Sequence, residues 1–463
     1  MKNSPSSHSL ASCLADFAVA LSWDDIPEAV LNRAKLQILD ALGTGIAATA
    51  YPFAGSTIAG VREFGGKGPC SVIGHPDKLV ARDAALANGV LVHGLDFDDT
   101  HLSSIVHPTA ACLPAALAMA ETTGAGGKEM LAAFVAGMET AIRIGLVADG
   151  AFHHAGYHAT AIASHFSSSV IAGKLLGLDA AALTSAQGIT GSTAAGIQVF
   201  LEEGAWTKRL HPGWGAVAGI TAAYLARNGF VGPSRPYEGK FGLFETHFQG
   251  NAAETDPNQL ADGLGERWRL AETAIKPYPV CHFIHGCADA AIELSHEVNA
   301  SDIETVEALL PEPTLPIVAE PAEAKMAPQT DYEAKFSAQF VVAACLARGR
   351  FGLAELSDAA LSDPELTALT KRVRCSADPD TAFPDYFSGG VRVALRDGQT
   401  LARHIRVNSG AGERLLDSNG VAAKFLACAE TQIGADSAER ICDLVLTLER
   451  HESAALGAAL AAG

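Results

Sequence analysis

The chain has 463 residues, of which 48% are hydrophobic and 18% are charged. This composition excludes a largely disordered chain, and the length exceeds what one compact core usually holds. The formal net charge of −19 repels a phosphate backbone, so we expect neither nucleic acid nor an anionic membrane as a partner. A small anionic substrate remains compatible with this charge, because a few cations in a cleft dominate the local potential.

Two further features concern the compartment. We find no apolar run that approaches the roughly 20 residues of a membrane helix, and the N-terminal residues lack the basic-then-apolar pattern of a secretory signal. The nine cysteines are scattered and include no CxxC pair, which is typical of free thiols in a reducing compartment. We therefore expect a cytoplasmic protein.

Helical patterns dominate the chain up to about residue 268. The stretch SWDDIPEAVLNRAKLQILDALG opens with the capping residues Ser22 and Asp24, has Pro27 in its first turn, and then repeats apolar residues every three or four positions. Similar helices are predicted over residues 81–95, 108–124, 127–146, 159–176, 180–196 and 213–228. Their many Ala and Gly residues allow close helix packing. We expect a large all-α domain over residues 1–268, completed by C-terminal helices in residues 410–463.

The pattern changes over residues 269–409, where prolines and alternating apolar residues become frequent. Strands are predicted in IETVEALLP, KRVRCSA and GGVRVALRDGQTLARHIRV, and Asp397-Gly398 in the last of these is a strong hairpin signal. Helices at 283–297 and 331–348 are interleaved with the strands. We therefore predict a mainly α protein whose second, smaller domain is an α+β lid.

Polar chemistry is concentrated in four stretches, residues 93–108, 153–165, 207–213 and 275–289, each at a predicted helix end. Helix starts offer unpaired N–H groups that suit carboxylate binding. A zinc site would draw on His154 and His158, which are spaced to share a helix face, or on the stretch CHFIHGC. The spacings match no structural zinc pattern, and the EF-hand glycine and glutamate are missing, so we predict no metal.

Proton transfer is the second interpretation of these stretches. Histidine changes charge near neutral pH, so imidazoles that face Asp and Lys form a natural acid/base set. The alternative is structural, since Asp96 or Asp99 would also serve as a helix cap. Lys208, Arg209 and Lys276 are the basic residues in these stretches, and a role in anion binding is set against the ordinary exposed loop cation.

The motifs LDFDDTHLSSIVHPTA, GYHATAIASH, TKRLHPGWG, KPYPVCHFIHG and YEAKFSAQF together resemble those of the MmgE/PrpD family, in family order, from about residue 10 to about 430. This family includes 2-methylcitrate dehydratase, cis-aconitate decarboxylase and iminodisuccinate epimerase. The resemblance implies a helical domain with an α+β lid, a homodimer, no metal or organic cofactor, and a small anionic carboxylate as substrate.

The resemblance also selects residues. It implies catalytic roles for Asp96, His107, His158, Lys208 and His285. It also matches Thr100, for which a substrate-binding role is expected. The clustering of polar residues adds His154, Arg209, His211 and Lys276 as expected substrate-binding residues. We expect His158 or Asp96 to act as base, His107 or His285 to deliver a proton, and Lys208 to clamp a carboxylate.

The predicted function is a cofactor-independent lyase, a hydratase or dehydratase, that transfers protons next to a carboxylate of a small di- or tricarboxylate. The main alternative is an isomerase that epimerises a carbon next to a carboxylate. Thr100 to His107 is one residue longer than in the decarboxylase branch of the family, and Tyr332 is the nearest candidate for that branch's lid tyrosine. Decarboxylation therefore ranks lower, as does a zinc-stabilised protein that only binds carboxylates.

Overall fold

The computed structural model describes residues 8–249 and 255–461. The described chain divides into two compact units. The first contains the described residues up to Thr273 together with those from Asp417 onward, and the second is Ala274–Leu416. Helices account for 60% of the described residues and strands for 10%, in agreement with a mainly α fold.

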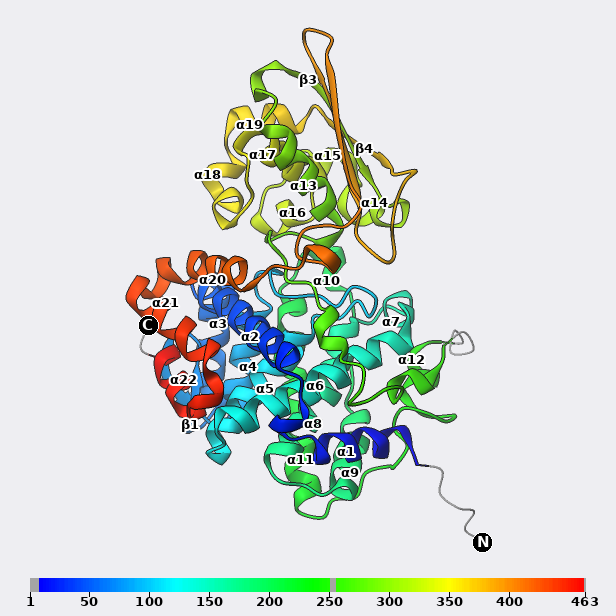
Figure 1. The fold of residues 1–463 in the computed structure, drawn as a ribbon, viewed down its shortest axis with the longest axis vertical. Helices are drawn as coiled ribbons and strands as arrows, with labels where there is room; N and C mark the ends of the chain where they lie inside the picture. Colours follow the sequence, from blue (N-terminus) through cyan, green and yellow to red (C-terminus); the bar gives the residue numbers. More distant parts are fainter. Residues whose placement is uncertain (1–7, 250–254, 462–463) are drawn as a thin grey trace. The chain divides into compact units, whose positions relative to one another are not determined.

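Helices make up most of the first unit (Figure 1). The helices predicted over residues 81–95, 108–124, 127–146 and 159–176 are all present, with ends that shift by up to three residues. The last one predicted, 213–228, begins six residues earlier, at Thr207. The helices of this unit are α1 (Leu10–Ala20), α2 (Glu28–Ala48), α3 (Pro52–Phe64), α4 (Ala81–Val92), α5 (Pro108–Thr123), α6 (Gly127–Ala148), α7 (Ala151–His154), α8 (Ala159–Leu175), α9 (Ala180–Gly191), α10 (Phe200–Glu203), α11 (Thr207–Arg227), α12 (Leu243–His247), α20 (Ser418–Ile433), α21 (Ala435–Leu446) and α22 (Ser453–Ala461).

Small residues let α11 pack tightly against its neighbours. A Cβ atom at Gly89 of α4 would lie 2.4 Å from the Cα atom of Gly213 in α11, and a Cβ atom at Gly215 would lie 2.4 Å from the Cβ atom of Ser164 in α8. Contacts this short leave no room for a side chain. The close approach therefore fixes α4, α8 and α11 together, and these three helices carry most of the site described below.

The C-terminal helix α20 packs against α2, and the two lie side by side in Figure 1. Their contact includes a buried ion pair, in which the Nζ atom of Lys424 lies 2.6 Å from the Oδ1 atom of Asp40. The same ammonium donates to the main-chain oxygen of Phe97 at 2.7 Å and lies over the Phe97 ring. Lys424 thereby ties α20 to α2 and to the loop that follows α4.

The first unit is not purely helical, so the prediction of an all-α domain is wrong at one place. Strands β1 (Lys67–Val72) and β2 (His75–Leu79) form an antiparallel hairpin with two irregularities in register. Each strand contains a proline, Pro69 and Pro76, and neither shows a clean alternation of apolar and polar residues. The short, irregular strands therefore lacked the sequence signal on which strand prediction depends.

The second unit is built on a four-stranded sheet of order β4-β3-β5-β6. Strands β3 and β4 are parallel, and the other neighbours are antiparallel. The predicted hairpin is present, with Gly398 at φ 87° in its turn. The strands are β3 (Ile303–Leu310), β4 (Val373–Ala377), β5 (Gly389–Leu395) and β6 (Thr400–Ile405).

The helices of the second unit are α13 (His285–Ser295), α14 (Leu315–Val318), α15 (Ala322–Lys325), α16 (Asp331–Lys335), α17 (Ala338–Arg348), α18 (Asp358–Leu361) and α19 (Pro364–Thr370). Contrary to the prediction, residues 331–348 form two helices instead of one. The side chain of Ser337 accepts a hydrogen bond from the Phe340 amide and so caps a new helix, α17. The second unit therefore combines helices with a mixed sheet.

Contrary to our expectation from the sequence, one helix has the length and apolar composition of a membrane span. Helix α6 is long and apolar enough to cross a membrane by length and composition. Within the first unit, 94% of its most apolar window is buried. Burial of this extent is typical of a core helix, which explains its composition without a bilayer.

Candidate active site

The loop between α4 and α5, residues 93–107, carries the first group of polar side chains. Residues 93–102 are all buried, although three of them are aspartates. Within this loop Asp96 has φ 54°, in the left-handed region that costs a non-glycine residue about 1 kcal/mol. Such strain persists where the surrounding contacts determine the conformation, and it makes Asp96 a candidate functional residue.

Asp96 forms an ion pair with the first turn of α11. The Nζ atom of Lys208 lies 2.8 Å from the Oδ1 atom of Asp96, and the two side chains are 12% and 7% exposed. A buried carboxylate needs a cation or hydrogen-bond donors to stay ionised. The pair therefore brings together two of the predicted catalytic residues.

His107 is the N-cap residue of α5 and faces the same ion pair. Its Nδ1 atom donates to the main-chain oxygen of Asp99 at 2.8 Å and lies 3.3 Å from the Oγ1 atom of Thr100. A carbonyl oxygen only accepts, so Nδ1 carries a proton and Nε2 is the basic nitrogen of the neutral ring. Nε2 lies 3.9 Å from Oδ1 of Asp96. His107 therefore lies close to both Thr100 and Asp96, and the roles of these three residues remain predictions.

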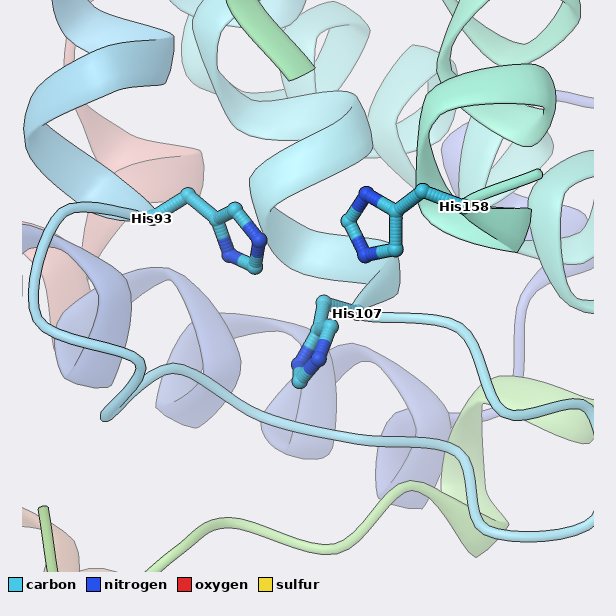
Figure 2. A group of neighbouring side chains, drawn as sticks. All are labelled: His93, His107 and His158. Atoms are coloured by element: carbon cyan, nitrogen blue, oxygen red, sulfur yellow. The ribbon is translucent and has the colours of Figure 1, made fainter. Parts of the chain in front are cut away.

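His93, the C-cap residue of α4, is a further imidazole at this place. Its Nδ1 atom lies 2.8 Å from the Oδ2 atom of Asp98, and both side chains are fully buried. Its ring centre is 4.9 Å from that of His107 and 5.6 Å from that of His158. Figure 2 shows the three rings around a common space, each from the end of a different helix.

His158 is the N-cap residue of α8 and pairs with α11. Its Nδ1 atom lies 3.0 Å from the Nδ1 atom of His211, so one ring donates and the other accepts. Burial lowers the pKa of His158 well below 6.5, and neighbouring His93 and Lys208 add to the effect. Burial likewise lowers the pKa of His211 to about 4. Both rings are therefore neutral at pH 7.

Asp99 belongs to the support of the site. Its carboxyl group accepts hydrogen bonds from both the amide and the hydroxyl of Thr109, in the first turn of α5. Burial raises the pKa of Asp99 to about 8, and nearby Asp98 adds to the rise. Its contacts with Thr109 therefore agree with the structural interpretation, in which Asp99 caps the helix that follows.

For two of the predicted substrate-binding residues, Arg209 and His154, the structure shows contacts other than those with the imidazole cluster. The Nε atom of Arg209 donates to the main-chain oxygen of Gly94 at 2.7 Å, and its guanidinium lies over the Phe53 ring. His154 is exposed at the end of α7. Their roles in binding remain predictions.

The expectation that His154 and His158 share a helix face is wrong. Helix α7 ends at His154, and α8 begins only after His158. Gly156, at φ 87°, lies in the turn between them. Of the two histidines of α7, His153 has its ring near His158, at 6.4 Å between centres, and burial lowers the pKa of His153 to about 4.

The remaining two predicted residues, Lys276 and His285, are buried in the second unit. His285 begins α13, and its ring centre lies 4.3 Å from that of His282. The Nε2 atom of His282 lies 3.0 Å from the Nδ2 atom of Asn408. The second unit thus has a polar cluster of its own. His282 was not given a catalytic or binding role from the sequence, although it lies in the stretch CHFIHGC that was considered for zinc.

Sequence reasoning also missed His93 and Asp98 as a pair. Five positions separate them, a spacing that places them on no common helix or strand face. The signal available was the local density of His and Asp in HGLDFDD, which flags the stretch without choosing among its members.

Two groups of described residues satisfy the distance requirement for a metal ion. In each group, one nitrogen or oxygen atom per residue lies within 4.8 Å of the others; the groups are His93, His107 and His158, and Asp96, Asp98 and His107. In the second group the ammonium of Lys208 already supplies a cation to Asp96. The linear spacing of these residues gave no sign of either group. The prediction of no metal remains a prediction.

The arrangement in the first unit is suited to proton transfer. One ammonium, one ion-paired carboxylate and several neutral imidazoles lie in a largely buried cluster. A carboxylate substrate would find a cation in Lys208, and a carbon-bound proton would find a basic nitrogen on His107.

Comparison with known proteins agrees with these observations. The MmgE/PrpD N-terminal domain matches residues 12–256, and the MmgE/PrpD C-terminal domain matches residues 278–450. A cis-aconitate decarboxylase-like protein of Aspergillus oryzae is 27% identical over 455 residues, which cover 94% of each chain. The human cis-aconitate decarboxylase is 28% identical over 468 residues, covering 96% of this chain and 93% of the human one. The cis-aconitate decarboxylase of Aspergillus terreus is 27% identical over 457 residues, covering 94% and 92%.

Proposed function

The chain belongs to the MmgE/PrpD family, and on this premise we propose that it is a lyase that hydrates or dehydrates a small di- or tricarboxylate. The reaction moves a proton at a carbon next to a carboxylate. One observation carries the proposal: Lys208, His107 and His158 come together from three separate segments in a largely buried cluster.

The charge of each side chain indicates its role in the proposed reaction. A proton next to a carboxylate is weakly acidic, and negative charge builds on that carboxylate as the proton leaves. Lys208 stabilises this charge, and its pairing with Asp96 makes Asp96 a poor base. His158 is a weak base because burial lowers its pKa well below 6.5. His107 is therefore the proton carrier of the first unit.

In dehydration, His107 takes the proton through Nε2, and the electrons of the C–H bond form the double bond as the C–O bond breaks. The departing hydroxyl takes a proton from an acid and leaves as water. We expected His285 from the sequence as this proton donor, and that role stays a prediction. Hydration is the reverse of these steps.

Decarboxylation is a second candidate, and the names of the relatives favour it. The relatives of Aspergillus oryzae, Aspergillus terreus and human, each 27% to 28% identical to this chain, are all named for cis-aconitate decarboxylase. In that reaction the carbon–carboxylate bond breaks, carbon dioxide leaves, and the carbon takes a proton from the enzyme. The same proton carrier serves both reactions in opposite directions.

The test is a substrate screen in deuterated water. Purified protein is incubated with 2-methylcitrate, citrate, cis-aconitate and related di- and tricarboxylates, and both the proton NMR spectrum and released carbon dioxide are followed. We expect interconversion of a hydroxy acid and an alkene, with deuterium at the carbon next to a carboxylate.

Three outcomes would overturn the hydratase. Release of carbon dioxide would make the protein a decarboxylase, inversion with exchange but no alkene would make it an epimerase, and no exchange with any acid would reject proton transfer altogether. Lys208→Met serves as the inactive control.

The predicted homodimer also stands as a proposal. Light scattering coupled to size-exclusion chromatography measures the mass directly, and a monomer at micromolar concentration would reject it.

A further inference from the structure

The buried pair of His93 and Asp98 has no role in the mechanism above, although it lies at the centre of the cluster. The Nδ1 atom of His93 lies 2.8 Å from the Oδ2 atom of Asp98. That same Oδ2 atom lies 3.8 Å from the Nδ1 atom of His107. One carboxylate oxygen of Asp98 therefore lies close to the imidazoles of both His93 and His107.

We propose that His93 is a positioning residue that sets the proton affinity of His107 through the carboxylate that the two share, Asp98. The inference rests on the proposed function, in which His107 carries the proton. It assigns to His93 and Asp98 the task of adjusting that carrier.

The charge balance explains how this works. The negative charge of Asp98 favours the protonated form of His107, because opposite charges attract across 3.8 Å in a buried site. The N–H group of His93 donates to the same oxygen and draws part of its charge away from His107. Asp98 thus raises the proton affinity of His107, and His93 moderates the increase.

The orientation of His93 supports this role. With Nδ1 directed at Asp98, Nε2 is buried and has no hydrogen-bond partner among the described residues. The ring stands beside the His107 and His158 rings in Figure 2. A histidine needed only for packing would bury no unsatisfied nitrogen, since this carries a cost that an apolar residue avoids.

Other charged and titratable groups of the first unit surround the pair and remain constant in the comparison below. They come from the same loop and from helices α2, α8, α11 and α20. These groups are Asp96, Asp99, Asp40, Arg33, His158, Lys208, His211 and Lys424.

The test measures the titration of His107 by NMR in the full-length protein labelled at histidine, with His107→Gln used to assign the signal. Asp98→Asn removes the negative charge and should lower the His107 pKa by about one unit. His93→Leu removes the donor and should raise it by about one unit. His93→Asn keeps a donor in the same place and should restore the wild-type value.

The opposite signs separate this role from a structural one. A residue that only supports the fold would shift the His107 pKa in the same direction in both variants, or in neither, and either result overturns the inference. If His93→Leu does not fold, Asp98→Asn compared with His93→Asn decides, since an unshifted His107 in Asp98→Asn rejects it.

The matched control is His101→Asn. His101 is a buried histidine of the same loop, but its Nε2 atom lies 3.3 Å from Glu272. It should leave the His107 pKa unchanged. The titration requires no turnover, so its result stands even if the substrate screen finds no activity. If the protein is active, the pH dependence of kcat/KM should shift with the same signs.

Discussion

The ammonium of Lys208 lies 2.8 Å from the carboxylate of Asp96, although 112 positions separate the two residues in the chain. The first turn of α11 presents the lysine, and a strained loop after α4 presents the aspartate. The pair places a cation beside the imidazole of His107, and our predictions start from this geometry.

Replacing Lys208 by Met should lower kcat by about 100-fold or more, which is the usual cost of removing one group that stabilises developing charge. The methionine keeps the length and apolar stem of the side chain, so the fold should persist by circular dichroism. Lys240→Met, at an exposed lysine, is the matched control and should retain wild-type kcat. Equal activity of the two variants would remove Lys208 from the mechanism.

Acid should destabilise the first unit through its buried imidazoles. Burial lowers the pKa of His153 and of His211 to about 4, whereas an unfolded histidine titrates near 6.5. Between these values the unfolded chain binds more protons, so the stabilisation present above pH 6.5 is lost as the pH falls toward 4. The free energy of unfolding by urea should therefore decrease from pH 7 to pH 5.

His153→Gln removes one of these groups and should make that decrease shallower than in the wild type. Comparing the two proteins cancels the contributions of all other groups, Asp99 included. Parallel pH profiles would show that His153 keeps an ordinary pKa.

Asp99 should behave in the opposite way. Burial raises its pKa to about 8, so the folded protein binds a proton that the unfolded chain releases near pH 4. This stabilisation is complete below pH 4 and is lost as the pH rises through 8. Asn imitates the neutral acid, so Asp99→Asn should match the wild type within about 0.5 kcal/mol near pH 4, where Asp99 is at least about half protonated in both the folded and the unfolded chain.

The wild type should then lose stability relative to Asp99→Asn as the pH rises from 4 to 8. Asp179→Asn, at an N-cap on the exposed start of α9, is the matched substitution control. A difference that is constant over this range would contradict a raised pKa.

Metal removal should leave the activity unchanged. We expect dialysis against a chelator to preserve kcat, because Lys208 supplies the cation at Asp96. Elemental analysis of the purified protein provides the independent measurement. Stoichiometric zinc, lost together with activity and restored with it, would reject the metal-free mechanism.

The sequence predicted the regular parts of the fold well, for reasons visible in single elements. Helix α5 begins at Pro108, where a proline favours the first turn, and the hairpin of β5 and β6 turns at Asp397-Gly398. The hairpin of β1 and β2 escaped prediction because its strands contain prolines and pair irregularly. Strand prediction depends on a local alternation of apolar and polar residues, and these two strands lack that alternation.

The site was predictable only in part. The resemblance selected Asp96, His107, His158 and Lys208, which the structure brings together. It did not select His93, because the importance of that residue lies in a distance to Asp98 and to two other rings. The sequence spacing suggested that His154 and His158 share a helix face, but Gly156 interrupts that helix. Contacts across a turn cannot be derived from helical spacing.

The anchor of the site loop has a consequence for how the protein is made. The main-chain oxygen of Phe97 is held by Lys424, a residue 327 positions later. A ribosome synthesises the chain from the N-terminus, so the loop and all of its aspartates emerge long before the lysine that secures them. The site is therefore among the last features of the first unit to become complete. A nascent chain that stalls before α20 contains every residue of the Asp96 loop but lacks the lysine that holds the loop in place.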